Sequence, residues 1–163
     1  MVEPTPESRQ LLVADIERTL PHRYPFLFVD RITEFVPGER IAAIKHFSAG
    51  DQAGQGHFPE APVVPAGIVL EMVTQLGAVL VLERPEMKDK VAVILNIPMA
   101  RMIEPVQPGD TLRVEARVVR LRESVGELKG MAYRDGTLVA EGQVRFAIAN
   151  ASDLLPAGRP LTP

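Results

Sequence analysis

Two residues in the middle of the chain have the side chains that acid–base chemistry needs. Glu71 stands near the start of a strongly apolar stretch, residues 67–83 (GIVLEMVTQLGAVLVLE), and His57 precedes it within the segment GHFP. A histidine, with an ordinary pKa of about 6.5, suits proton abstraction near neutral pH. A carboxyl group in apolar surroundings has a raised pKa, so it can keep its proton and then donate it. The two residues could therefore serve as base and acid in one reaction.

The surroundings of Glu71 make it the more informative of the two. A charged, unpaired carboxylate in an apolar helix loses hydration at a cost on the order of several kcal/mol. Thr74 and Gln75 follow at i+3 and i+4, on the same side of a helix, so Gln75 could hold the Glu71 side chain in place. The alternative is a structural carboxylate that is neutralised by an arginine or faces a subunit contact, and the residue pattern favours neither interpretation.

Proton abstraction next to a carbonyl group would need a third group beside this pair. Removing that proton builds negative charge on the carbonyl oxygen, which free N–H groups at a helix start can stabilise. Pro65 is of a type tolerated at a helix start, and the backbone N–H groups of Ala66 and Gly67 follow it, about one turn before Glu71. Base, acid and oxyanion donors therefore fall within one short stretch.

Other residues of the chain exclude several kinds of site. We assign His22 and His46 no catalytic role, since most histidines are surface or core residues. The histidines lack metal-ligand spacing and the chain has no cysteine, so we expect no metal, disulfide or cysteine nucleophile. The net charge of −3 argues against a nucleic-acid partner. The polar start, residues 1–10, shows no signal-peptide pattern, and we expect a cytoplasmic protein.

The helix that must position Glu71 is the clearest structural element. We expect residues 67–83 to form a helix that is buried on all sides, because it is apolar all round. A membrane span is disfavoured, because Glu71, Thr74 and Gln75 would be costly in lipid. The length of 163 residues, with 46% hydrophobic and 24% charged residues, predicts a single domain over residues 1–163.

Alternating apolar and polar residues predict a sheet around this helix. The predicted strands cover residues 28–35, 40–47, 91–95, 99–103, 111–121 and 138–148. The runs 91–95 and 99–103 are expected to be one strand that is interrupted at Pro98. The predicted turns are at Pro37-Gly38, Pro108-Gly109-Asp110 and Asp135-Gly136. Residues 11–19 are expected to form a short helix, residues 48–65 a loop, and the tail from Ala151 a loose segment. The expected class is α+β, an antiparallel sheet wrapped around one long helix, without a predicted strand order.

The motifs at these positions resemble a known enzyme family. GHFP at 56–59, followed by PVVPAGIVLEMVTQ at 62–75, is similar to the 3-hydroxyacyl–acyl carrier protein dehydratases of fatty-acid synthesis. LPHRYPFLFVDRI at 20–32 and PVQPGDTL at 105–112 match the same family in order and spacing, so the resemblance covers about residues 20–148. It implies a hot-dog fold, a homodimer or larger homo-oligomer with paired helices, and active sites across the dimer interface.

The resemblance also implies roles for the residues that match the motifs. His57 corresponds to the family's catalytic histidine, Glu71 to its catalytic acid and Gln75 to the glutamine that supports the acid. A sister branch, which also isomerises the double bond, has Asp at the position of Glu71, so the Glu implies the dehydratase-only branch. Ala66 stands where the family has the glycine whose N–H polarises the thioester. The implied substrate is an acyl thioester on acyl carrier protein, with coenzyme A as another possible carrier, and no cofactor.

One departure from the family lies directly before the catalytic histidine. The family usually has Asn-Glu-Pro-Phe-Phe-Gln there, whereas residues 50–55 are Gly-Asp-Gln-Ala-Gly-Gln. The small residues Ala53 and Gly54 therefore stand in place of two aromatic ones. We expect them to form the substrate pocket together with Phe58 and Pro59, and to widen it for bulky or branched acyl groups.

A second departure concerns the surface that meets the carrier. In a later strand the family usually has several basic residues, of which Arg101 remains, while Met99, Met102 and Glu104 occupy neighbouring positions. The basic edge that would meet an acidic carrier protein is therefore thinned.

Two other functions stay open at the level of the sequence. One is a thioesterase on the same fold, in which Glu71 activates water. The other is a non-catalytic acyl-binding or assembly module of a biosynthetic cluster, although the presence of both His57 and Glu71 speaks against it.

Overall fold

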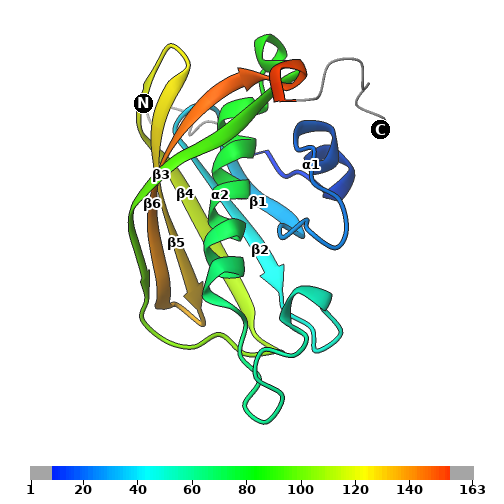
Figure 1. The fold of residues 1–163 in the computed structure, drawn as a ribbon. Coiled ribbons are helices and arrows are strands. Elements are labelled where there is room, and N and C mark those ends of the chain that lie inside the picture. Colours follow the sequence, from blue (N-terminus) through cyan, green and yellow to red (C-terminus); the bar gives the residue numbers. More distant parts are fainter. Residues whose placement is uncertain (1–8, 155–163) are drawn as a thin grey trace, which may run out of the picture.

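The structure, a computed structural model, describes residues 9–154. A curved sheet of six antiparallel strands wraps around one long helix, α2 (Ala66–Leu82), as Figure 1 shows. The strands are β1 (Arg31–Val36), β2 (Arg40–His46), β3 (Lys90–Met102), β4 (Thr111–Arg122), β5 (Val125–Arg134) and β6 (Thr137–Asn150). They lie in the order β1-β2-β4-β5-β6-β3. The predicted α+β class is confirmed.

Shorter elements complete the described chain. These are α1 (Val13–Thr19), η1 (Gln52–Gly54), η2 (Pro85–Met87) and η3 (Ala151–Leu154). The tail was expected to be loose from Ala151, but its first residues form η3, and Ala151 is buried and donates its N–H to Asp89. The prediction that residues 1–163 form one domain stays a prediction, since both ends lie outside the described residues.

The predicted turns connect strands where the backbone needs left-handed conformations. Gly38, between β1 and β2, has φ +73°, and Gly109, before β4, has φ +102°. Asp135 and Gly136 have φ of +49° and +81°, which suits the tight hairpin between β5 and β6. That turn implied a strand before residue 135, and the structure gives its bounds as those of β5.

The predicted interruption at Pro98 is wrong. Strand β3 continues through Pro98, and only its pairing with β6 becomes irregular, with register shifts between Ile94 and Asn96 and between Asn96 and Met99. Strand β3 is at the edge of the sheet, where a proline's missing N–H costs no ladder hydrogen bond if it faces outward.

Helix α2 approaches the sheet closely because glycines remove side chains from the contact. Gly130 of β5 and Gly142 of β6 are paired across the sheet. A Cβ atom at Gly130 would collide with Val73 of α2 and lie 3.1 Å from the carbonyl oxygen of Glu115. A Cβ at Gly142 would lie 2.8 Å from Leu70. Because neither glycine has a side chain, the helix can pack directly against the backbone of β5 and β6 at this point.

One stripe of α2 is left partly exposed by the rest of the chain. The residues facing the sheet and α1 are buried, whereas Gly67 is exposed and Glu71, Thr74 and Ala78 are partly exposed. The expectation that the helix is buried on all sides is therefore wrong for a single chain. The sheet curls around α2 from one side only, and the uncovered stripe is the one that carries Glu71.

Strand β3 adds a second uncovered surface. It pairs only with β6, so its outer edge is open, and several large apolar side chains near this edge are exposed: Ile94, Leu95, Ile97, Met102 and Ile103. At the opposite edge, β1 is met by an isolated bridge from Leu11 to Ile32. Within residues 9–154, no helix has the length and apolar character that a membrane crossing requires.

Because α2 packs closely against the sheet, adding one methyl group at Gly130 should destabilise the fold. We expect Gly130→Ala to lower the free energy of unfolding by about 1–3 kcal/mol, because Val73 and the Glu115 backbone would have to move. Gly50→Ala is the matched control, since a Cβ there would meet only Ser48 at an ordinary 3.6 Å. Urea unfolding measures both, and equal midpoints for the two variants would contradict the close contact.

Candidate active site

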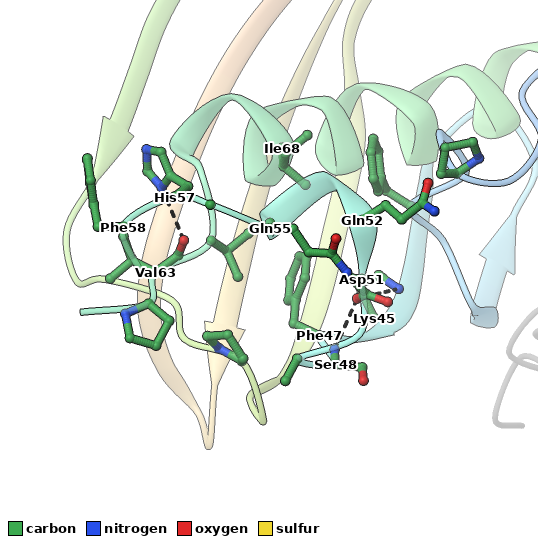
Figure 2. Close-up of a pocket in the computed structure, with 18 of the residues that line it drawn as sticks. Lys45, Phe47, Ser48, Asp51, Gln52, Gln55, His57, Phe58, Val63 and Ile68 are labelled. Carbon is green, nitrogen blue, oxygen red and sulfur yellow. Dashed lines mark hydrogen bonds and ion pairs between the residues drawn. The ribbon is translucent and has the colours of Figure 1, made fainter. Parts of the chain in front are cut away.

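His57 is held in the loop between β2 and α2 by contacts within that loop (Figure 2). Its Nδ1 lies 3.1 Å from the carbonyl oxygen of Val63, and its backbone N–H donates to Gly54. A carbonyl oxygen only accepts hydrogen bonds, so in the neutral ring Nδ1 carries the proton. The lone pair is then on Nε2, which is the atom that can take a proton from a substrate.

The His57 ring lines a cavity of about 440 Å³, here called the His57 cavity. Of the predicted pocket residues, Gly54, Phe58 and Pro59 line it as well. The Phe58 ring packs at 4.1 Å from the His57 ring, centroid to centroid, and is itself mostly exposed. The side chain of Ala53 lies outside what the structure describes, so its place in the pocket stays a prediction.

Glu71 occupies the second turn of α2, with its side chain about one-fifth exposed. Gln75 Nε2 donates to its Oε1 over 3.0 Å, which is the contact that the i+4 spacing predicts. Thr74 Oγ1 lies 3.1 Å from Oε2 and 2.8 Å from the Glu71 carbonyl oxygen. Because the hydroxyl can donate to the carbonyl, it can also accept from a protonated Oε2. The arrangement suits both protonation states of an acid.

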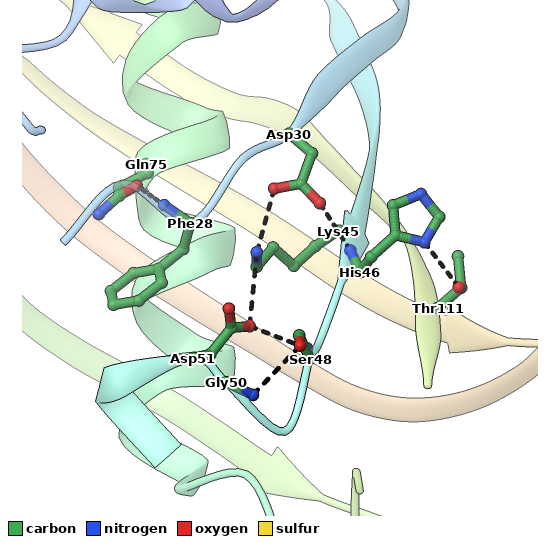
Figure 3. A network of polar contacts seen from close by, with 9 residues as sticks. All are labelled: Phe28, Asp30, Lys45, His46, Ser48, Gly50, Asp51, Gln75 and Thr111. Carbon is green, nitrogen blue, oxygen red and sulfur yellow. Dashed lines mark hydrogen bonds and ion pairs between the residues drawn. The ribbon is translucent and has the colours of Figure 1, made fainter. Parts of the chain in front are cut away.

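Gln75 fixes the carboxyl group to another part of the chain. Its side chain is almost fully buried, its Oε1 accepts from the Phe28 N–H at 2.9 Å, and its Nε2 donates to the Phe26 carbonyl at 2.8 Å. These backbone partners allow only one orientation of the amide, which is the orientation that directs Nε2 to Glu71. Figure 3 shows the bond between Gln75 and Phe28.

His22 also lies beside Glu71, which the sequence analysis missed. Its Nε2 is 3.8 Å from Glu71 Oε1, and no partner is found among the described residues for its buried Nδ1. Burial lowers the pKa of His22, and the Glu71 carboxylate only partly offsets this effect. The signal that could have revealed His22 is its place in the motif LPHRYPF, which also contains Phe26.

Glu71 and His22 line a second cavity, here called the Glu71 cavity. It has a volume of about 410 Å³ and apolar walls from α2, β3, β5 and β6, among them Val73, Ala78, Ile94, Leu128 and Phe146. It shares no lining residue with the His57 cavity. Within one chain, the two residues expected to act together therefore open into different cavities.

Ala66 and Gly67 are the first two residues of α2, directly after Pro65. The N–H groups of the first helical turn have no carbonyl partner inside the helix. The first intrahelical bonds to the Pro65 carbonyl come instead from Ile68 at 2.9 Å and Val69 at 3.3 Å. The two N–H groups named in the sequence analysis are thus available to a ligand.

Groups that could bind a metal are not evident in the described part of the chain, where no three His, Asp or Glu side chains cluster suitably. The expectation that the protein needs no metal or cofactor stays a prediction.

Comparison with known proteins identifies the family. The model of the FabA-like domain matches residues 20–144. The chain belongs to the FabA-like family. Relatives include 3-hydroxyacyl-acyl-carrier-protein dehydratase FabZ of Symbiobacterium thermophilum, 44% identical over 85% of this chain and 97% of that protein. The protein of the same name from Enterococcus faecalis is 42% identical over 85% of this chain and 99% of its own length. The dehydratase resemblance is therefore confirmed.

Solved structures confirm the hot-dog fold of this FabA-like chain. The dehydratase heterocomplex ApeI:P from Xenorhabdus doucetiae aligns with a TM-score of 0.73 at 18% identity, covering 85% of this chain and 93% of that one. A hot-dog-like protein from Thermanaerovibrio acidaminovorans aligns with a TM-score of 0.61 at 20% identity, over 74% of this chain and 87% of that one.

The lowered pKa of His22 predicts a pH-dependent stability. As the pH falls from about 7 to about 5, the unfolded chain takes up a proton on this histidine before the folded chain does. The free energy of unfolding should therefore fall, and His22→Gln should weaken this dependence. Urea unfolding at several pH values measures it, with His46→Gln, at an exposed strand end, as the control. Equal pH slopes for wild type and His22→Gln would refute the assignment.

Proposed function

We propose that this chain dehydrates 3-hydroxyacyl thioesters carried on acyl carrier protein to trans-2-enoyl thioesters, in fatty-acid or related acyl-chain biosynthesis. The observation that carries the proposal is that the two residues at the matched motif positions, His57 and Glu71, are oriented as a base and an acid would be. His57 offers an unprotonated Nε2, and Glu71 is held by Gln75 in a geometry that suits an acid. The names of the FabZ relatives support the same reaction.

We propose further that the active unit is a homodimer in which each site uses both subunits. Three features support this: the separate cavities of His57 and Glu71, the uncovered stripe of α2, and the open apolar edge of β3. Long, apolar edge strands seldom remain open in solution. Pairing of β3 with its copy would bury this edge and bring the Glu71 stripe toward the partner subunit. Assembly beyond the dimer is compatible with these features.

The reaction then follows from the positions of three groups. His57 Nε2 takes a proton from C2 of the substrate while the N–H groups of Ala66 and Gly67 stabilise negative charge on the thioester oxygen. The C2 electron pair forms the C2–C3 double bond, and the C3–O bond breaks. Glu71 gives its proton to the departing hydroxyl, which leaves as water. A proton then passes from the imidazolium to the carboxylate, directly or through solvent, and restores both groups.

The charges on β3 bear on how the chain would meet its carrier. Arg101, the basic residue retained on β3, is paired with Glu141 at 2.9 Å, and Glu141 also meets Lys129 at 3.3 Å. Arg101 therefore presents little uncompensated positive charge to an acidic carrier. An enoyl-forming assay with matched acyl groups on acyl carrier protein and on coenzyme A tests the carrier, and a plain acyl thioester in parallel tests for thioesterase activity. Cytoplasmic location remains part of the proposal.

A shared site predicts complementation between two inactive variants. We expect His57→Ala and Glu71→Gln each to lose on the order of 10²–10⁴ in rate, and the double variant to be little worse than the weaker single one. When the two single variants assemble together, half of the dimers are hybrids with one intact site, so about a quarter of wild-type activity should return.

Dehydration rates of the separate and co-assembled variants measure this recovery. The control is co-assembly of either single variant with the double variant, which yields no intact site. Activity that stays at the level of the single variants, in samples shown to contain hybrids, would contradict a shared site.

The oxyanion role of Ala66 predicts a contrast between two substitutions. Ala66→Gly keeps the N–H and should change the rate only modestly, whereas Ala66→Pro removes it. Loss of one oxyanion donor typically costs on the order of 10²–10³ in rate. Proline is tolerated in the first helical turn, and circular dichroism would verify folding. A folded and fully active Ala66→Pro variant would show that this N–H does not bind the oxyanion.

A further inference from the structure

The His57 cavity has an end that the dehydration mechanism does not use. His57 lies at one end, and Lys45 and Asp51 lie at the other (Figure 2). Between them the wall is mainly apolar, with Leu27, Phe28, Phe47, Val64 and Ile68 among the lining residues. The volume of about 440 Å³ falls within the range of ~300–1,000 Å³ that small-molecule sites occupy. Space for a ligand therefore extends away from the reacting histidine within the same subunit.

Gly54 is a lining residue at which this space can be altered. It lines the cavity in the short helix η1, and a Cβ atom built on it would meet nothing within 4 Å. Its φ does not lie in the left-handed region, unlike that of Gly56 two residues later, so a larger side chain is compatible with its backbone. A larger side chain can therefore be placed at Gly54, on the border of the cavity, without a backbone clash.

The charged end of the cavity holds one ammonium group between two carboxylates. Lys45 is nine-tenths buried, its Nζ donates to Asp30 Oδ1 over 3.0 Å and lies 3.8 Å from Asp51 Oδ2 (Figure 3). The same ammonium lies 5.5 Å from the centre of the Phe47 ring. Asp30 also accepts from the His46 N–H, and Asp51 accepts from the Ser48 N–H. Because Lys45 is already paired with two carboxylates, this end offers no free positive charge to an anionic ligand.

We infer that the His57 cavity receives the acyl group of substrates that are branched close to the reacting carbons. This inference rests on the proposed function and names its substrate class: uncharged 3-hydroxyacyl thioesters with a bulky substituent at C3. In the proposed mechanism the C2 proton lies at Nε2 of His57, and the same residue lines this cavity, so we expect the group attached to C3 to reach it. A straight chain can instead extend along the apolar Glu71 cavity, which has a similar volume of about 410 Å³.

Filling the cavity at Gly54 tests the inference with two isomeric substrates. These are the N-acetylcysteamine thioesters of 3-hydroxy-4,4-dimethylpentanoate and 3-hydroxyheptanoate, which have equal carbon numbers. We expect wild type to dehydrate both, and Gly54→Phe to lower kcat/KM for the branched isomer on the order of tenfold or more. The straight isomer should lose less, so the ratio of the two kcat/KM values, branched over straight, should fall on the order of tenfold. The matched control is Gly50→Phe, because Gly50 is exposed and does not line the cavity. It should leave kcat/KM for both isomers unchanged.

Binding separates this inference from the proposed reaction. Calorimetry with the saturated 4,4-dimethylpentanoyl thioester, which cannot be dehydrated, should show binding to wild type and Gly50→Phe and its loss in Gly54→Phe. Gly54→Leu provides a milder filling variant should Gly54→Phe fail to fold. If a folded Gly54→Phe or Gly54→Leu protein keeps the selectivity and the binding of wild type, the His57 cavity does not receive the branched acyl group. This conclusion holds even if dehydration itself persists. Gly54-dependent binding without any dehydration by wild type supports the cavity and refutes the proposed reaction.

Discussion

The close contact between α2 and the sheet determines which residues of the helix can do chemistry. Gly130 and Gly142 let the helix rest directly on the strands, so the residues that face the sheet are fully engaged in packing. Beyond its first turn, α2 can be reached by a ligand or another subunit mainly along the opposite stripe, which carries Glu71, Thr74 and Ala78. Glu71 lies on that stripe, where apolar walls surround a carboxyl group that is still accessible.

The two candidate catalytic groups are positioned by different means. His57 is oriented by the loop that carries it, through the carbonyl of Val63 six residues later. Glu71 is oriented by Gln75, whose amide is itself fixed by the backbone of the segment that contains Phe26 and Phe28. The orientation of His57 therefore depends on local loop structure, whereas that of Glu71 depends on a contact between parts of the chain that are distant in sequence.

The loop before His57 also borders the cavity that His57 lines. Gly54 of this loop lines that cavity, and Lys45, paired with Asp30 and Asp51, lies at its far end. The proposed base and the residues proposed to select the substrate therefore belong to neighbouring parts of the chain.

The amino-acid sequence by itself predicted the elements and the residues that depend on local pattern. The apolar run of α2, the turns at Gly38 and Gly136, and the contact of Gln75 with Glu71 follow from spacing along one helix or one hairpin. The strand order, the continuity of β3 through Pro98 and the place of His22 beside Glu71 were decided only by the tertiary structure. Each depends on contacts between distant segments, which periodicity does not encode. For the same reason, periodicity did not show that His57 and Glu71 open into separate cavities of one chain, an arrangement compatible with the site across a dimer interface that the resemblance implied.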